Sequence, residues 1–306
     1  MFHRNRPDAD HGSGTDHELE DHDRGLAFDL ETLVSRRRAL TLIGGAGLVA
    51  AAAACQPTGD RGGSTTTTTT TTATSGSGTA TTTAAAGSGA TTTTTGSTSV
   101  AEIPDETAGP YPGDGSNGPD VLTQSGIVRS DIRSSFGSYS GTAQGVPNTV
   151  RLKVLSLSNG VAPLVGGAVY LWHCTREGGY SLYSQGVTDQ NFLRGVQETD
   201  ANGEVTFTSI FPAAYDGRWP HIHFEVYPSL DAATSAGSKL KTSQLAFPKD
   251  VCDVVYATSG YGASVSNLAR TSLSSDMVFR DGYSSQLATV TGDVANGYLT
   301  TLTLAV

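Results

Sequence analysis

Two histidines that lie two residues apart carry the clearest chemical signal in the sequence. His221 and His223 stand in the run His-Ile-His-Phe-Glu-Val, which is typical of a β-strand. Successive side chains of a strand point to opposite faces, so both imidazoles leave one face while Ile222 and Phe224 pack on the other. This spacing predicts a metal site with two nitrogen ligands from one sheet, although a His-x-His pair by itself is more often a plain polar pair.

Tyrosines are the next candidate ligands, because histidine is scarce in the part of the chain that can fold. Four of the seven histidines precede residue 23, and we expect His173, which follows a tryptophan within a strand, not to be a ligand. Tyr215 stands six residues before His221, and Tyr180 follows the end of an expected strand. A phenol has a pKa of about 10, so only a strongly Lewis-acidic ion holds it as tyrosinate. Ferric iron does this better than zinc.

Short runs of aromatic and β-branched residues, separated by turn formers, recur from residue 101 onward. In the last of them Leu302, Leu304 and Val306 alternate with threonine and alanine, as in a half-buried strand. No stretch shows helical periodicity with caps. The pattern predicts an all-β fold, a mainly antiparallel β-sandwich with the histidine pair on one strand. The expected strands span 149–157, 167–174, 203–210, 221–227, 244–247, 287–292 and 298–306.

Residues 1–54 have the order of an export signal with a long polar leading region. A cluster of three arginines, Arg36–Arg38, precedes a weakly apolar run that is shorter than the ~20 residues of a membrane-spanning helix. The arginine pair resembles a twin-arginine (Tat) signal. The three alanines before Cys55 resemble a lipoprotein processing site with Cys55 as the lipidated residue, and simple secretion stays open. We expect an exported chain, extracellular or anchored to the outer face of the cytoplasmic membrane.

Residues 55–100 consist almost entirely of threonine, serine, glycine and alanine. Such a segment buries too little apolar surface to offset its ordering entropy, so we expect a disordered linker. Residues 101–306 are long enough for one β-sandwich domain. The formal net charge is −10 and this domain has no basic cluster, which argues against nucleic acid as a partner.

The three cysteines do not form a Cys-x-x-Cys pair, which disfavours a metal held by sulfur. In an exported domain Cys174 and Cys252 could form one disulfide and leave Cys55 for lipidation. Two buried free thiols are an equal alternative, because spacing alone does not fix a pairing.

Several short motifs, taken together and in order, resemble the intradiol ring-cleavage dioxygenases, the protocatechuate and catechol 1,2-dioxygenase family. The resemblance covers roughly residues 105–260, and the export signal suggests an exported, actinobacterial-type member. The matching runs are Gly109-Pro-Tyr-Pro112, Leu164-Val-Gly-Gly-Ala-Val-Tyr-Leu-Trp172, Gly179-Tyr-Ser181, Asn191-Phe-Leu-Arg194, Thr199-Asp-Ala-Asn-Gly203, Tyr215-x-x-Arg218-x-x-His221-x-His223-Phe224 and Gln244-Leu-Ala-Phe-Pro248.

The resemblance implies that Tyr180, Tyr215, His221 and His223 bind one Fe(III), with Tyr215 and His221 axial. A catechol would then chelate the iron and displace Tyr215 and a hydroxide, each of which can accept a substrate proton. O2 would open the ring between the two hydroxyl-bearing carbons, giving a cis,cis-muconate-type product. The expected partners are therefore a catecholic small molecule and O2, and no nicotinamide or flavin is required.

The resemblance also implies roles around the iron site. Arg218 would lie near the substrate, where its permanent charge stabilises anionic character on the ring. Gln244 would support the residues that bind the iron without binding the iron itself. Tyr111 and Trp219 would line the substrate pocket, with plain packing as the alternative for Tyr111. Tyr183 is a weaker candidate ligand than Tyr180.

Two other functions are compatible with the same residues. One is a cell-surface β-sandwich binding module with a vestigial metal site. The other is a zinc hydrolase that uses His221, His223 and a carboxylate. The visible absorption of tyrosinate on Fe(III), or its absence, would separate them from a dioxygenase. Any contact with a membrane would come only through a lipid anchor at Cys55.

Overall fold

The structure is a computed structural model that describes residues 100–306. The expected export signal, the lipidation site at Cys55 and almost all of the expected linker lie outside the described residues and stay predictions. Between residues 100 and 306, none of the helices has the length and apolar character that a bilayer crossing requires.

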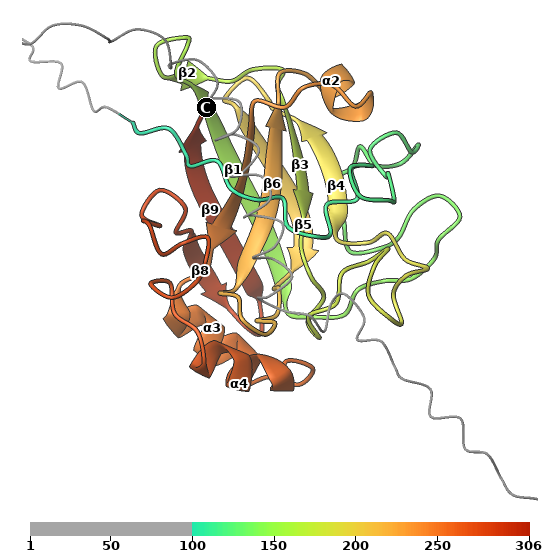
Figure 1. Ribbon diagram of the computed structural model, residues 1–306, viewed down its shortest axis with the longest axis vertical. Coiled ribbons are helices and arrows are strands. Elements are labelled where there is room, and N and C mark those ends of the chain that lie inside the picture. The colour runs from blue at the N-terminus through green and yellow to red at the C-terminus, as the bar shows by residue number, and fades with distance from the viewer. Residues whose placement is uncertain (1–99) are drawn as a thin grey trace, which may run out of the picture. The chain divides into compact units, whose positions relative to one another are not determined.

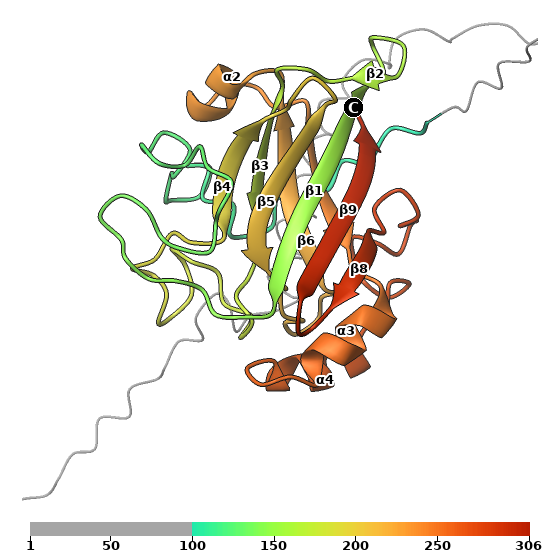
Figure 2. The same cartoon turned by 180° about the vertical axis from the view of Figure 1, so that it is seen from behind.

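Two β-sheets face one another (Figures 1 and 2). All strand pairs are antiparallel except β1 and β9, which run parallel and place the last strand of the chain inside the first sheet. The first sheet has the order β2 (Ala162–Pro163), β1 (Pro147–Ser156), β9 (Gly297–Ala305), β8 (Thr289–Asp293), and β5 (Glu204–Ile210) also pairs with β1. The second sheet has the order β4 (Arg194–Glu198), β3 (Ala168–Trp172), β6 (His221–Tyr227), β7 (Lys241–Ala246). The predicted fold class, an all-β sandwich, is confirmed.

The main hydrophobic core lies between the two sheets. On β1 the buried residues Val150, Leu152 and Val154 alternate with more exposed ones, as strand geometry requires. They share one cluster with Phe224 and Val226 of β6 on the opposite sheet. Full burial of one such side chain stabilises the fold by about 1.5–3 kcal/mol.

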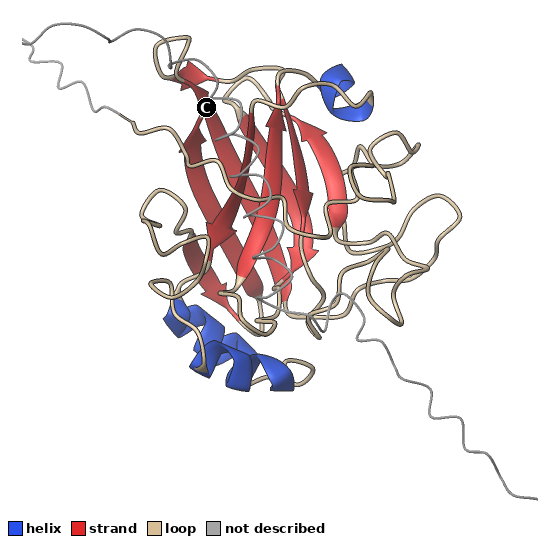
Figure 3. Ribbon diagram, in the orientation of Figure 1, coloured by secondary structure: helices blue, strands red, loops and turns tan. Residues whose placement is uncertain are grey.

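Within residues 100–306 there are also three short helices, which the sequence pattern did not predict (Figure 3). They are α2 (Leu230–Thr234), α3 (Lys249–Tyr256) and α4 (Gly262–Ala269), each of eight residues or fewer. Two turns are too short for a 3.6-residue period to show clearly in the sequence. On α3 the buried residues Cys252, Val255 and Tyr256 nevertheless have the spacing of one helical face.

The candidate disulfide between Cys174 and Cys252 is not formed, and both residues are buried free thiols. Cys252 lies on α3 in the core between the sheets. Cys174 belongs to a second cluster, and its Sγ lies 3.7 Å from the carbonyl oxygen of Ala213. Because each thiol is surrounded by its own apolar cluster, burial raises the pKa of both.

The alternation on β6 generates a stability prediction. Val226→Ala should lower the free energy of unfolding by about 2 kcal/mol, since it removes two buried methyl groups and leaves a cavity. Val254→Ala on α3 is the matched control, because Val254 is 55% exposed; it should stay within about 0.5 kcal/mol of the parent. Urea denaturation measures both, and equal losses would contradict the assignment of faces.

Candidate functional site

The two histidines lie on β6, whose seven residues are all buried. Three apolar residues of β6 face the core between the sheets, so His221 and His223 leave the outer face, as the alternation predicts. On this face His223 is the cross-strand neighbour of Trp172 on β3 and of Gln244 on β7. The indole of Trp172 stacks on the His223 ring with centroids 4.9 Å apart. The strand ladder therefore fixes His223 from two sides, whereas His221 pairs only with Ala246 of β7.

The imidazole nitrogens of the pair converge. Nε2 of His221 lies 3.0 Å from Nε2 of His223 and 3.3 Å from the phenol oxygen of Tyr215. Nδ1 of His221 lies 2.6 Å from the carbonyl oxygen of Trp219, to which it must donate, so Nε2 carries the lone pair. Burial, and then neighbouring positive charge, hold the pKa of both histidines well below the ordinary value. Both rings are therefore neutral at pH 7 and can act as ligands.

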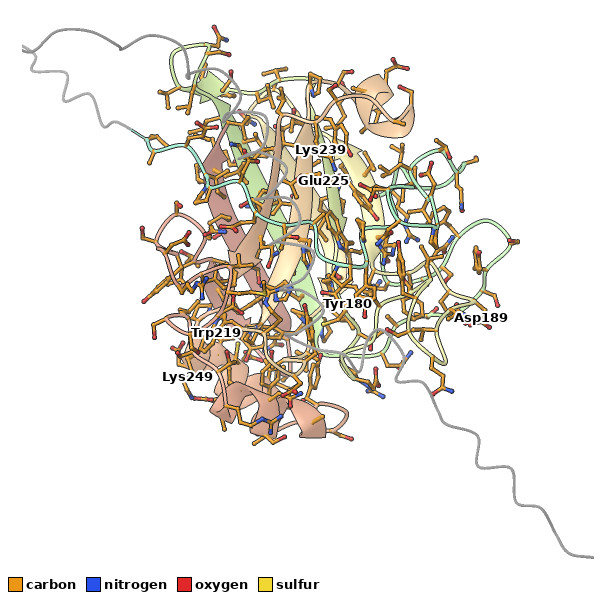
Figure 4. The ribbon with its side chains drawn as sticks, viewed as in Figure 1. Tyr180, Asp189, Trp219, Glu225, Lys239 and Lys249 are labelled. Carbon is orange, nitrogen blue, oxygen red and sulfur yellow. The ribbon has the colours of Figure 1, made fainter. Side chains whose placement is uncertain are left out.

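Tyr180 supplies a second phenol to the same place. Its ring centroid lies 6.1 Å from that of His223 and 5.9 Å from that of Tyr215. The hydroxyl is buried and makes no hydrogen bond of ordinary geometry with any residue between 100 and 306, and the Tyr215 phenol is a close polar neighbour. Burial, and then the Tyr215 phenol, raise the pKa of Tyr180 well above its ordinary value. Figure 4 shows Tyr180 lower in the view than Glu225, at about the height of Trp219. A buried polar atom that is poorly satisfied is costly, and a bound cation would offset that cost.

Three of the four candidate donors, Tyr215, His221 and His223, have the spacing that one metal ion requires. Metal–nitrogen bonds of about 2.1 Å at right angles place neighbouring donors about 3 Å apart, close to the separations of the two histidines and Tyr215. Among residues 100–306, no group of three or more histidine, cysteine, aspartate or glutamate residues could hold a metal. The third ligand of the zinc hydrolase alternative is therefore not found there. Two imidazoles and two phenols suit ferric iron better than zinc.

A buried ion pair lies beside these donors. Nε of Arg218 donates to Asp276 at 3.0 Å, and both side chains have 0% exposure. Nη1 of Arg218 lies 3.4 Å from the Tyr215 oxygen, and Nη2 donates to Oε1 of Gln244 at 2.7 Å. Gln244 in turn donates to the carbonyl of Thr107 at 2.9 Å. Arg218 and Gln244 are thus in contact, and their hydrogen bonds fix the guanidinium next to a donor oxygen.

Comparisons with known proteins identify the family of the chain. The family model described as "Dioxygenase" matches residues 118–273, more than half of the chain. The chain belongs to the intradiol ring-cleavage dioxygenase family.

Individual relatives are more distant. A chlorocatechol 1,2-dioxygenase of Rhodococcus opacus is 37% identical over 54 residues, which cover 18% of this chain and only 21% of that protein. The crystal structure of dioxygenase Tetur07g02040 has 25% identity and a TM-score of 0.52, covering 67% of this chain and 94% of that one. An intradiol ring-cleavage dioxygenase from Tetranychus urticae has 26% identity and a TM-score of 0.49, covering 60% and 87%.

The two expected pocket residues, Tyr111 and Trp219, have different environments. Tyr111 is buried and lies 5.0 Å from Tyr180 between ring centroids, so it is close to the donors. Trp219 is a correction, because its indole packs in the core between the sheets and donates to the carbonyl of Phe247 at 2.9 Å. The Trp219 backbone serves the site instead. Its N–H donates to Asp276 at 2.7 Å, and its carbonyl is the partner of His221.

Tyr183 and His173, the other two candidates, make hydrogen bonds that do not involve the donor group. Tyr183 makes hydrogen bonds with the N–H of Gly113 and with Asn117, both at 2.9 Å, so its oxygen is engaged away from the donors. His173 is buried, with Nε2 2.7 Å from the hydroxyl of Ser209 and Nδ1 2.8 Å from a backbone carbonyl. Both ring nitrogens of His173 are therefore satisfied, in line with its expected role as a non-ligand.

Two charged residues at the site were not identified from the sequence as members of it. Asp276 lies in an irregular segment, and no motif or spacing points to it. Arg194 was seen only as part of a family motif, yet its buried guanidinium binds the carbonyls of Tyr111, Pro112 and Ser181 at 2.8–3.0 Å. It thereby joins the segment of Tyr111 to the loop of Tyr180. Because the strand that carries Arg194 was not predicted, no sequence signal pointed to this role.

The buried ion pair generates a prediction for the metal-free protein. Asp276→Asn keeps the shape but removes the carboxylate charge that pairs with the buried Arg218 guanidinium. The free energy of unfolding should fall by about 3–5 kcal/mol. The matched control is Asp253→Asn, which breaks an exposed 2.7 Å pair with Lys249 and should cost less than about 1 kcal/mol. Urea denaturation decides, and a loss for Asp276→Asn no larger than the control would contradict the role of the pair.

Proposed function

We propose that this chain is a non-haem Fe(III)-dependent intradiol dioxygenase that opens a catecholic ring with O2 to a cis,cis-muconate-type product. The observation that carries the proposal is the meeting of two neutral imidazole nitrogens with two phenols, next to a buried guanidinium. Tyr180, Tyr215, His221 and His223 would hold one iron. The aligned part of the curated relative covers only 21% of that protein, so family membership alone does not assign the activity.

The iron, when bound, would supply the Lewis acidity and the electron-accepting capacity that activate a catecholate toward O2. The chain's own residues supply proton transfer, charge and exclusion of water. The Tyr215 oxygen lies within reach of Arg218 and His221, and as a tyrosinate it can accept the proton of a substrate hydroxyl. Arg218 keeps its charge at all relevant pH values, so it stabilises negative charge that develops on the ring.

The hydrogen bonds that Arg218 makes fix the direction in which its guanidinium points. Asp276 and Gln244 hold two of its three nitrogens, which leaves Nη1 directed toward Tyr215. A fixed cation requires no reorganisation when negative charge appears, which is the basis of electrostatic catalysis in a buried site. Asp276 offsets the cost of burying the guanidinium, and its carboxylate also accepts the N–H groups of Trp219 and Val278.

The function is tested by colour and by turnover. The purified protein with one iron per chain should absorb visible light, and it should consume O2 with at least one of catechol, protocatechuate, hydroxyquinol or a larger catechol. Tyr215→Phe should lower kcat about a hundredfold or more, since it removes the proton acceptor. Tyr283→Phe, at a residue with 36% exposure, is the matched control and should retain parental activity. A colourless protein with stoichiometric iron would refute the proposal.

We also propose that the chain is exported and carries a lipid on Cys55. Support comes from the order of arginines, apolar run and Ala-Ala-Ala-Cys in residues 36–55. In a bacterial host, labelled palmitate should be incorporated into the full chain, and Cys55→Ser should abolish it while secretion continues. Labelling of the Cys55→Ser variant equal to the parent would rule out the anchor.

A further inference from the structure

The segment that leads to Tyr215 is held mainly by helices. Phe211 follows the end of β5, and from there to Ala214 the backbone runs outside any strand. The hydroxyl of Tyr256, on α3, donates to the carbonyl of Pro212 at 3.1 Å. The hydroxyl of Tyr261, just before α4, donates to the carbonyl of Phe211 at 2.8 Å. Buried backbone groups need partners, and here side chains of the α3–α4 pair provide them.

Ala214, the residue before Tyr215, has both backbone polar groups bound by α4. Its N–H donates to the hydroxyl of Ser264 at 3.0 Å, and its carbonyl accepts from Nδ2 of Asn267 at 2.9 Å. Ser264 is 1% exposed. Residues three apart share a helix face, so Tyr261, Ser264 and Asn267 present one continuous row to the segment.

Contacts on either side of Ala214 complete this support. The N–H of Ala213 donates to the carbonyl of Thr175 at 3.3 Å. Arg270, directly after α4, pairs with Asp216 at 2.7 Å, but both side chains are more than half exposed, so this pair adds little. A Cβ built on Gly178 would lie 3.2 Å from Cβ of Tyr215, so the tyrosine also packs closely against the loop that carries Tyr180. The two tyrosine loops are thus in contact.

The support of Tyr215 differs from that of the histidines. His221 and His223 belong to β6, which has ladders on both sides. Tyr215 lies outside any strand and so is not held by a strand ladder. The backbone of the preceding residue, Ala214, is held by two side-chain hydrogen bonds from α4. We propose that Ser264 and Asn267 are positioning residues that set the place of the Tyr215 phenol. The ligand role of that phenol rests on the proposed function, whereas the hydrogen bonds do not.

The first test uses the metal-free protein. Ser264→Ala and Asn267→Ala each remove one bond to Ala214, so amide hydrogen exchange in residues 213–216 should become about fivefold faster or more. Ser266→Ala is the matched control. It is the same change on the same helix, but Ser266 is exposed and its hydroxyl bonds only to Ala263. Exchange within β1 should be unchanged in all three variants. Exchange in residues 213–216 equal to that of Ser266→Ala would overturn the proposal.

The second test uses the iron-loaded protein. Loss of either bond should shift the tyrosinate absorption band toward that of Tyr215→Phe and lower kcat more than it changes KM, while Ser266→Ala retains the parental spectrum. An unshifted band in both variants would also overturn the positioning role. If the parent itself shows no such band, the proposed function fails, and the exchange result still decides whether α4 holds the segment. Should one variant not fold, the other removes a separate bond and carries both tests.

Discussion

Burial of β6 on both faces is the constraint on which the rest of the site depends. The inner face is apolar and needs only packing, but the outer face carries His221, His223 and Glu225 in a dry environment. Buried polar groups require partners. Glu225 receives the hydroxyl of Tyr227 at 2.7 Å and the ammonium of Lys239. His221 bonds to the backbone carbonyl of Trp219, His223 stacks on the indole of Trp172, and the two rings contact each other. The outer face of β6 is therefore a polar centre covered by loops.

Much of the fold follows from alternation, which is a local property. The predicted strand 221–227 has the same bounds as β6, and the expected strands at 149–157 and 298–306 differ from β1 and β9 by one or two residues. β4 was missed because Arg-Gly-Val-Gln-Glu has almost no apolar content; its burial comes from covering loops. The parallel pairing of β1 with β9 was also inaccessible, since it joins residues about 150 positions apart.

The site shows the same division between local and distant information. Residue type and spacing pointed to two imidazoles and two phenols, because their chemistry is intrinsic to the side chains. Gln244 was expected as support, and its bond to Arg218 is consistent with that role. Trp219 was misplaced because neighbours in an irregular segment can point in opposite directions, and here the indole enters the core. Asp276 was not found because only the fold brings it to Arg218, 58 residues earlier.

Burial also bears on which ion the donors select. Because burial raises the pKa of Tyr180, its phenol stays protonated until a nearby cation stabilises the phenolate by more than the free energy that its desolvation costs. Arg218 and Asp276 form a buried ion pair, and burial keeps both histidines neutral. If the donors bind a metal ion as we propose, the stronger field of a trivalent ion would ionise the two phenols more readily than that of a divalent ion.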